Sequence, residues 1–197
     1  MTLPTKLSVL RIVLTFLVMA CLFAPGGAAK SAALALFLAA GFTDWLDGYL
    51  ARRWRQTSPL GALLDPIADK VLVLGTFLAF VQLRLVPAWM VLVIALREFL
   101  ITGIRLYAAG RRLVLPAAAE GKQKTVSQMV AIIVILAVLV IRELPPGAAW
   151  HSDRAQALMR WAVAGGLWVA VILTVVSGVA FFWRHRTVLR DVVGARS

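Results

Sequence analysis

The chain has 197 residues, of which 61% are hydrophobic and only 15% are charged, and its net charge is +12. A soluble domain is nearer to about 45–50% apolar and about 25% charged, and a chain of this size cannot bury the excess in one core. These proportions exclude a soluble enzyme and a disordered chain. The basic residues stand between hydrophobic runs, which indicates membrane topology and no nucleic-acid partner.

Six apolar stretches follow one another along the chain, each close to the roughly 20 residues that a membrane-spanning helix needs. The first could instead be a signal peptide, but further spans follow it at once. We therefore predict an all-α polytopic membrane protein that forms a single domain over residues 1–197. The six predicted transmembrane helices cover residues 7–27, 31–50, 60–82, 86–108, 125–142 and 160–183.

The basic residues lie unevenly on the two sides of these spans. They concentrate in the N-terminal segment with Lys6 and Arg11, in the connections 51–59 and 109–124, and in the tail after Phe182. The three other connections hold few basic residues. Because cytoplasmic loops carry the excess of Lys and Arg, both termini are expected in the cytoplasm.

The acidic residues are concentrated at one place. Of the 9 acidic residues, Asp44, Asp47, Asp65 and Asp69 fall at the end of the second span and the start of the third. An ionised aspartate at the centre of a membrane helix costs about 2.5–3.5 kcal/mol on the insertion scale. A polar cavity, a partner charge or a bound cation must offset this cost.

The spacing of these aspartates places two on each helix in a stripe with very small residues, since positions three and four apart share a helix face. Facing each other, the stripes would form a cluster of carboxylates, which favours a hard cation such as Mg²⁺ or Mn²⁺. Four carboxylates can hold two such ions, an arrangement that assists phosphoryl displacement. The first stripe is Asp44, Asp47, Gly48 and Ala51, and the second is Gly61, Asp65 and Asp69.

Each of these features has a plainer interpretation. The small residues could serve close helix packing instead of ligand approach. Arg52 could bind a phosphate or be one more cytoplasmic charge. The aspartates could pair with Lys70, Arg97 or Arg105, although pairing would not require two matched stripes. Ser58 before Pro59 is a favourable start for the third helix.

The pattern Asp44-x-x-Asp47-Gly48-x-x-Ala51-Arg52, followed after eight residues by Gly61-x-x-x-Asp65-x-x-x-Asp69, resembles the signature of the CDP-alcohol phosphotransferases at all eight positions. The six-span layout is also similar to that family. The segments "REFLITGIR" and "EGKQKTVSQM" resemble the bacterial branch that forms phosphatidylglycerophosphate. A match of this length is far more specific than a lone glycine motif.

The resemblance implies transfer of the phosphatidyl group from CDP-diacylglycerol to sn-glycerol 3-phosphate, with release of CMP. It implies that the four aspartates bind two divalent ions (Mg²⁺ or Mn²⁺) and that Asp69 is also the general base. A homodimer in the bacterial cytoplasmic membrane, with the active site facing the cytosol, is implied as well. The residues implied to contact CDP-diacylglycerol are Gly48, Ala51, Arg52, Ser58 and Gly61.

The acceptor carries its own phosphate, which needs cations. The candidates are Arg105, Lys122 and Lys124, whereas Arg97 is expected to pair with Glu98 or to be buried in a structural role. Each candidate could equally be a topology charge. The first span departs from the family pattern, because it reads Thr5-Lys6-Leu7-Ser8 where the family often has an Asn-x-x-Thr-like element.

Two rival functions share the acidic cluster. A sister enzyme of cardiolipin or inositol-phosphate type would keep the metal site and differ in the acceptor contacts of region 97–128. A cation-coupled transporter would use the carboxylates as its ion site, but the later apolar segments contain no second aspartate pair. A structural scaffold would not require four carboxylates in one cluster.

Overall fold

The computed structural model describes residues 3–54, 59–110, 120–145 and 149–186, and within these ranges the side chains of 3–5, 44–54, 59–66, 69, 120–122 and 149 lie outside the description. Every regular element in the described residues is helical, so the predicted all-α class is confirmed for them. The helices are α1 (Leu3–Phe23), α2 (Gly27–Trp54), α3 (Pro59–Gln82), α4 (Ala88–Gly110), α5 (Glu120–Arg142), the short 3₁₀ helix η1 (Ala149–His151) and α6 (Asp153–Arg184).

The helix boundaries follow local chemistry. Helix α3 begins at Pro59, as predicted, because proline lacks an N–H group and fits the first helical position. Helix α6 begins at Asp153, well before the predicted residue 160, because the Ser152 side chain caps it by accepting from the Ala155 N–H at 3.3 Å. Residues 153–159, predicted as part of a connection, are therefore helical.

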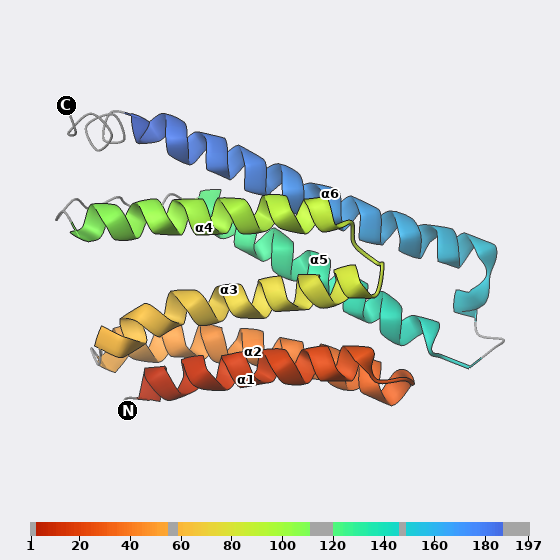
Figure 1. Cartoon of the computed structure of the whole chain (residues 1–197). Coiled ribbons are helices and arrows are strands. Elements are labelled where there is room, and N and C mark those ends of the chain that lie inside the picture. The colour runs from red at the N-terminus through yellow and green to blue at the C-terminus, as the bar shows by residue number, and fades with distance from the viewer. Residues whose placement is uncertain (1–2, 55–58, 111–119, 146–148, 187–197) are drawn as a thin grey trace.

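The helices form two groups joined by α5 (Figure 1). Helix α1 packs against both α2 and α3, whereas α4 packs against α6. Helix α5 contacts α2 and α6 and passes between the two groups. The shared core contains fully buried side chains from four helices, namely Phe37, Phe77, Phe80, Ile94 and Ile132.

Two glycines allow neighbouring helices to approach closely. A Cβ atom on Gly75 of α3 would lie 2.8 Å from Thr15 Cγ2 of α1. A Cβ atom on Gly41 of α2 would lie 2.8 Å from Met129 Cε of α5. Membrane helices associate through small residues of this kind, since lipid provides no hydrophobic drive between helices.

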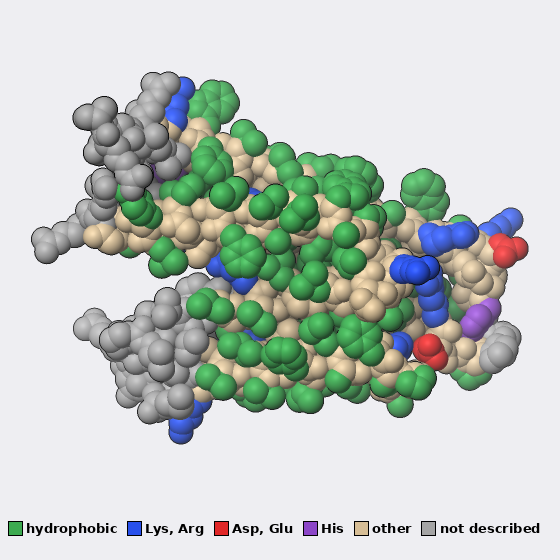
Figure 2. All heavy atoms as spheres, in the orientation of Figure 1, with side chains coloured by type: hydrophobic (Ala, Val, Ile, Leu, Met, Phe, Trp, Pro, Cys, Tyr) green, Lys and Arg blue, Asp and Glu red, His purple; other side chains and the backbone are tan. Residues whose placement is uncertain are grey.

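The outer surface is strongly apolar (Figure 2). Large side chains such as Phe16, Phe99 and Trp161 are 65%, 62% and 77% exposed, respectively. Among the described residues, three helical segments are long and apolar enough to cross a membrane: Lys6–Phe23, Gln123–Arg142 and Asp153–Arg184. An exposed apolar surface of this extent is typical of a membrane protein.

The start of α1 and the end of α6 lie at the same end of the helix bundle (Figure 1). The end of α2, the start of α3, the end of α4 and the start of α5 lie there too. We call this the signature end, and the end with the α3–α4 turn and the start of α6 the opposite end. Arg11, counted above among the basic residues of the N-terminal segment, lies inside α1 and is only 1% exposed.

Candidate active site

The eight signature residues lie at the ends of two helices. Its first half lies in the last turns of α2 and its second half in the first turns of α3, so the predicted helical placement is confirmed. Ser58 lies outside the described residues, as do the side chains of the other signature positions. The α2 positions are Asp44, Asp47, Gly48, Ala51 and Arg52, and the α3 positions are Gly61, Asp65 and Asp69.

The short connection holds these helix ends near each other. Helix α2 ends at Trp54 and α3 begins at Pro59. A fully extended chain over that interval spans at most about 18 Å. Both halves of the signature therefore begin from neighbouring points at the signature end, and each runs about three turns into the bundle.

The donor set suits a hard divalent cation. Four carboxylates on two neighbouring helix ends supply only oxygen ligands, which Mg²⁺ and Mn²⁺ prefer. Among the side chains that the structure describes, which exclude these four, no group of three His, Cys, Asp or Glu residues could hold a metal ion.

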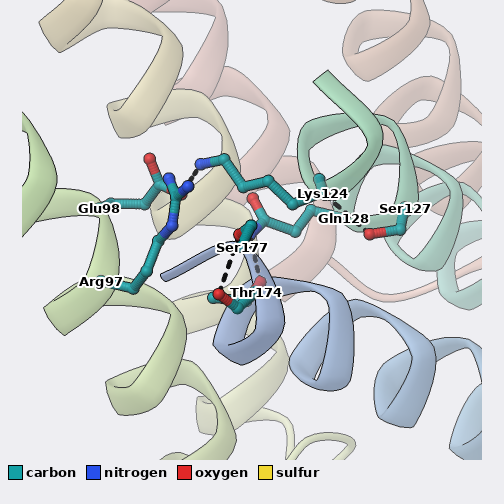
Figure 3. A network of polar contacts seen from close by, with 7 residues as sticks. All are labelled: Arg97, Glu98, Lys124, Ser127, Gln128, Thr174 and Ser177. Carbon is teal, nitrogen blue, oxygen red and sulfur yellow. Dashed lines mark hydrogen bonds and ion pairs between the residues drawn. The ribbon is translucent and has the colours of Figure 1, made fainter. Parts of the chain in front are cut away.

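A network of polar side chains connects α4, α5 and α6 inside the bundle (Figure 3). At its centre, Glu98 of α4 forms ion pairs with Arg97 of the same helix and with Lys124 of α5. The Arg97 Nη1–Glu98 Oε1 distance is 3.4 Å. The side chains of Lys124 and Glu98 are only 7% and 12% exposed, so the second pair joins the two helices at a nearly dry position.

Hydrogen bonds extend the network to α6. Gln128 Nε2 donates to Thr174 Oγ1 at 3.0 Å, which links α5 to α6, and Ser177 Oγ donates to the Thr174 carbonyl at 3.0 Å. Gly178 lets the Arg97 side chain pass close to α6, because an added Cβ would lie 3.3 Å from Arg97 Cγ. The network thus links the three helices inside the bundle.

The predicted acceptor residues differ in their surroundings. Arg105 is exposed and makes no hydrogen bond or ion pair with the residues that the structure describes. Lys124 is buried and paired with Glu98, whereas the side chain of Lys122 lies outside the described part. The expected pairing of Arg97 with Glu98 is confirmed.

A hollow opens at the signature end (Figure 2). It lies between the group of α1 to α3 and the group of α4 and α6. Basic side chains lie at its inner end. Positive charge at this position favours an anionic ligand.

Sequence reasoning missed the contribution of Gln128 and Thr174, and it missed Glu98 as the partner of Lys124. The sequence feature that could have predicted this network is the four-residue spacing of Lys124 and Gln128, which places both residues on one face of an apolar helix. A second missed feature is the buried polar stripe on α1, formed by Ser8, Arg11 and Thr15, which are 0%, 1% and 1% exposed.

Comparison with known proteins agrees with this architecture. The family model described as CDP-alcohol phosphatidyltransferase matches residues 1–176. Proteins named CDP-diacylglycerol–glycerol-3-phosphate 3-phosphatidyltransferase from Bacillus subtilis (strain 168) and Haemophilus influenzae are 37% and 35% identical. The first alignment covers 95% of this chain and 97% of that protein, and the second covers 66% and 72%.

A relative with a different acceptor is also similar. The protein from Oryza sativa subsp. japonica named cardiolipin synthase (CMP-forming) is 37% identical over 70% of this chain and 46% of its own length. The family match covers all eight signature positions, the helices α1 to α5 and the first three quarters of α6. The chain belongs to the CDP-alcohol phosphatidyltransferase family.

Proposed function

We propose that this protein transfers the phosphatidyl group of CDP-diacylglycerol to sn-glycerol 3-phosphate, giving phosphatidylglycerophosphate and CMP. The observation that carries the proposal is the division of the eight-residue signature between the adjoining ends of α2 and α3. The glycerol-3-phosphate transferase names of the bacterial relatives, one of them aligned over 95% of this chain, support the choice of acceptor.

We place all six helices across the bacterial cytoplasmic membrane, with both termini and the active site on the cytosolic side. Helices α2 and α3 are apolar over Gly27–Thr43 and Lys70–Gln82, and α4 is apolar apart from Arg97, Glu98 and Arg105. Their polar parts lie toward the signature end, where a water-filled site would solvate them. A homodimer, which the family resemblance implies, completes this arrangement.

The four aspartates are proposed to hold two divalent ions, Mg²⁺ or Mn²⁺. When bound, the ions neutralise the diphosphate of the lipid substrate and the charge that develops as CMP leaves. The protein contributes two carboxylates on each helix, at spacings that place each pair on one helix face.

In the proposed reaction the acceptor hydroxyl attacks the phosphorus of the phosphatidyl group, and the bond from that phosphorus to the CMP oxygen breaks. Asp69 takes the proton from the attacking hydroxyl as general base. The small side chains of Gly48, Ala51 and Gly61 leave room for the CDP portion, which Arg52 and Ser58 contact through charge and hydroxyl donation.

The phosphate of the acceptor is proposed to bind at Arg105, Lys122 and Lys124. Arg105 lies two helical turns from Glu98 on the same face of α4, nearer the signature end. Lys124 comes from α5 and keeps Glu98 as its counter-ion. Two cationic groups on opposed helices would bracket a dianionic phosphate between α4 and α5.

The deciding experiment measures CMP release by the purified protein in detergent with CDP-diacylglycerol and Mg²⁺ or Mn²⁺. Glycerol 3-phosphate, inositol phosphate and phosphatidylglycerol are supplied as separate acceptors. We expect release with glycerol 3-phosphate alone, loss on chelation with recovery on metal addition, and a fall of about 100-fold or more in Asp69→Asn.

The matched control is Asp153→Asn, which removes an exposed carboxylate in the first turn of α6 at the opposite end and should keep full activity. Release with phosphatidylglycerol would move the function to that of the rice relative, and release with inositol phosphate would move it to the other sister enzyme. Absence of release with every acceptor, in folded protein that binds metal, would overturn the proposal.

A further inference from the structure

A cavity of about 420 Å³ lies at the opposite end of the bundle, remote from the signature. The α3–α4 turn, the end of α5 and the first half of α6 surround it. Its size falls within the range of roughly 300–1,000 Å³ that is usual for small-molecule sites. None of the proposed catalytic residues lines it.

Three arginines from three different segments converge on this cavity. They are Arg84 of the α3–α4 turn, Arg142 at the end of α5 and Arg160 of α6. No acidic residue is among its described lining residues, and the three arginines make no hydrogen bond or ion pair between their side chains and other described residues. Basic side chains gather at this end of the molecule in Figure 2. Three uncompensated guanidinium groups attract an anion with several oxygen acceptors.

The backbone supplies independent evidence about Arg84. Its φ of 58° lies in the left-handed region. The turn is a Schellman motif, because the Leu85 N–H donates to the Phe80 carbonyl and the Arg84 N–H to the Val81 carbonyl, both at 2.9 Å. Glycine usually occupies this left-handed position, since an L side chain is strained there. An arginine at this position brings a charge to the cavity at the expense of stability.

The remaining walls are apolar and include Leu139, Ala164 and Leu167. Trp168 lines the cavity and lies against Trp89 of α4, with ring centroids 5.7 Å apart and both side chains about half exposed. Tryptophan side chains gather at the level of the lipid headgroups. The cavity therefore joins a cationic rim at headgroup depth to an apolar interior at the depth of the acyl chains.

We propose that this cavity binds an anionic phospholipid from the membrane leaflet opposite to the active site, with its phosphate at the three arginines and part of an acyl chain between α5 and α6. Charge complementarity selects an anionic headgroup over a zwitterionic one, whose ammonium group would meet the same arginines. The apolar walls select a lipid over a soluble phosphate.

The test uses native mass spectrometry of the purified full chain in detergent, titrated with phosphatidylglycerol or with phosphatidylcholine. We expect wild-type protein to bind at least one phosphatidylglycerol more tightly than phosphatidylcholine. The double variant Arg142→Gln/Arg160→Gln should weaken that binding about tenfold or more. Arg154→Gln, which removes an arginine of the same end outside the cavity lining, should bind as wild type does.

Two further variants distinguish a loss of lipid binding from a loss of folding. Arg84→Gly should weaken phosphatidylglycerol binding and yet raise the Tm, because glycine relieves the left-handed strain. Ala164→Phe fills the apolar part while keeping all three arginines, and it should also weaken lipid binding.

Three results would overturn the proposal. The first is equal binding of phosphatidylglycerol and phosphatidylcholine to wild-type protein. The second is identical lipid binding in Arg142→Gln/Arg160→Gln and Arg154→Gln. The third is displacement of phosphatidylglycerol by an equal concentration of glycerol phosphate or inorganic phosphate, which would assign the arginines to a soluble anion.

Discussion

Glu98 of α4 and Lys124 of α5 form an ion pair inside the bundle, and the same carboxylate also neutralises Arg97. The pair joins α4 to α5, the two helices that we propose to hold the acceptor phosphate. A single carboxylate thus balances two cationic groups, and the net positive charge that remains favours an incoming anion.

Removing the carboxylate should destabilise the protein. Glu98→Gln leaves Lys124 nearly buried without its counter-charge, which costs about 3 kcal/mol in comparable buried pairs. The Tm, followed by tryptophan fluorescence in detergent, should fall. The double variant Glu98→Gln/Lys124→Met should recover part of the loss, whereas the exposed control Glu143→Gln should not change the Tm. Equal Tm values for Glu98→Gln and Glu143→Gln would contradict this account.

The exposed Arg105 should act on the acceptor and not on the lipid substrate. Arg105→Gln removes one charged contact to the acceptor phosphate, so we expect the KM for glycerol 3-phosphate to rise about tenfold. The KM for CDP-diacylglycerol and the kcat at saturation should stay close to wild type. Steady-state kinetics measure these KM and kcat values, with Arg154→Gln as the control variant. A change confined to the KM for CDP-diacylglycerol would move Arg105 to the nucleotide site.

The hydrogen bond between Gln128 and Thr174 should contribute more to the free energy of unfolding than the hydrogen bond of a threonine hydroxyl within its own helix. Thr174 accepts across helices, whereas Thr76 Oγ1 donates to the Leu72 carbonyl of the same helix at 2.8 Å; both side chains are fully buried. Thr174→Val should therefore cost about 1 kcal/mol more than Thr76→Val, because it leaves the Gln128 amide unpaired. Unfolding in denaturant, compared between the two variants, tests this difference.

Substitution by alanine should change the Tm differently at three glycines. At Gly75 the added Cβ meets the stiff β-branched Thr15, so the substitution should destabilise. At Gly41 it meets only the terminal methyl of Met129, which can rotate away at little cost. At Gly103 nothing lies within 4 Å, so alanine should stabilise the helix by up to about 1 kcal/mol. The expected Tm order from highest to lowest is Gly103→Ala, Gly41→Ala, Gly75→Ala, and a Tm of Gly75→Ala equal to or above that of Gly41→Ala would refute the close α1–α3 contact.

The proposed orientation can be tested by labelling single cysteines in a Cys21→Ser background. Ala109→Cys lies in the last turn of α4 at the signature end, and His151→Cys lies in η1 at the opposite end; both positions are exposed. A membrane-impermeant maleimide added to intact cells should label the second cysteine and not the first. The reverse pattern would place the signature outside the cell and exclude a cytosolic substrate.

The sequence by itself determined the helices and the two stripes of the signature. Apolar length predicts a helix, and the 3.6-residue period fixes which residues of one helix share a face. The predicted second and third spans therefore agree with α2 and α3 to within about four residues at each end. Pro59 marked the start of α3 correctly for the same local reason.

Only the tertiary structure decided which side chains of different helices meet. Lys124 and Glu98, Gln128 and Thr174, and the three arginines of the cavity are brought together by helix crossings, and Arg11 is buried by the packing of α1 against its neighbours. In a membrane the apolar faces of all helices are equally compatible with lipid. The hydrophobic pattern of the sequence therefore does not fix how each helix is rotated about its own axis. That rotation depends on small residues and polar contacts between helices, which come from distant parts of the chain.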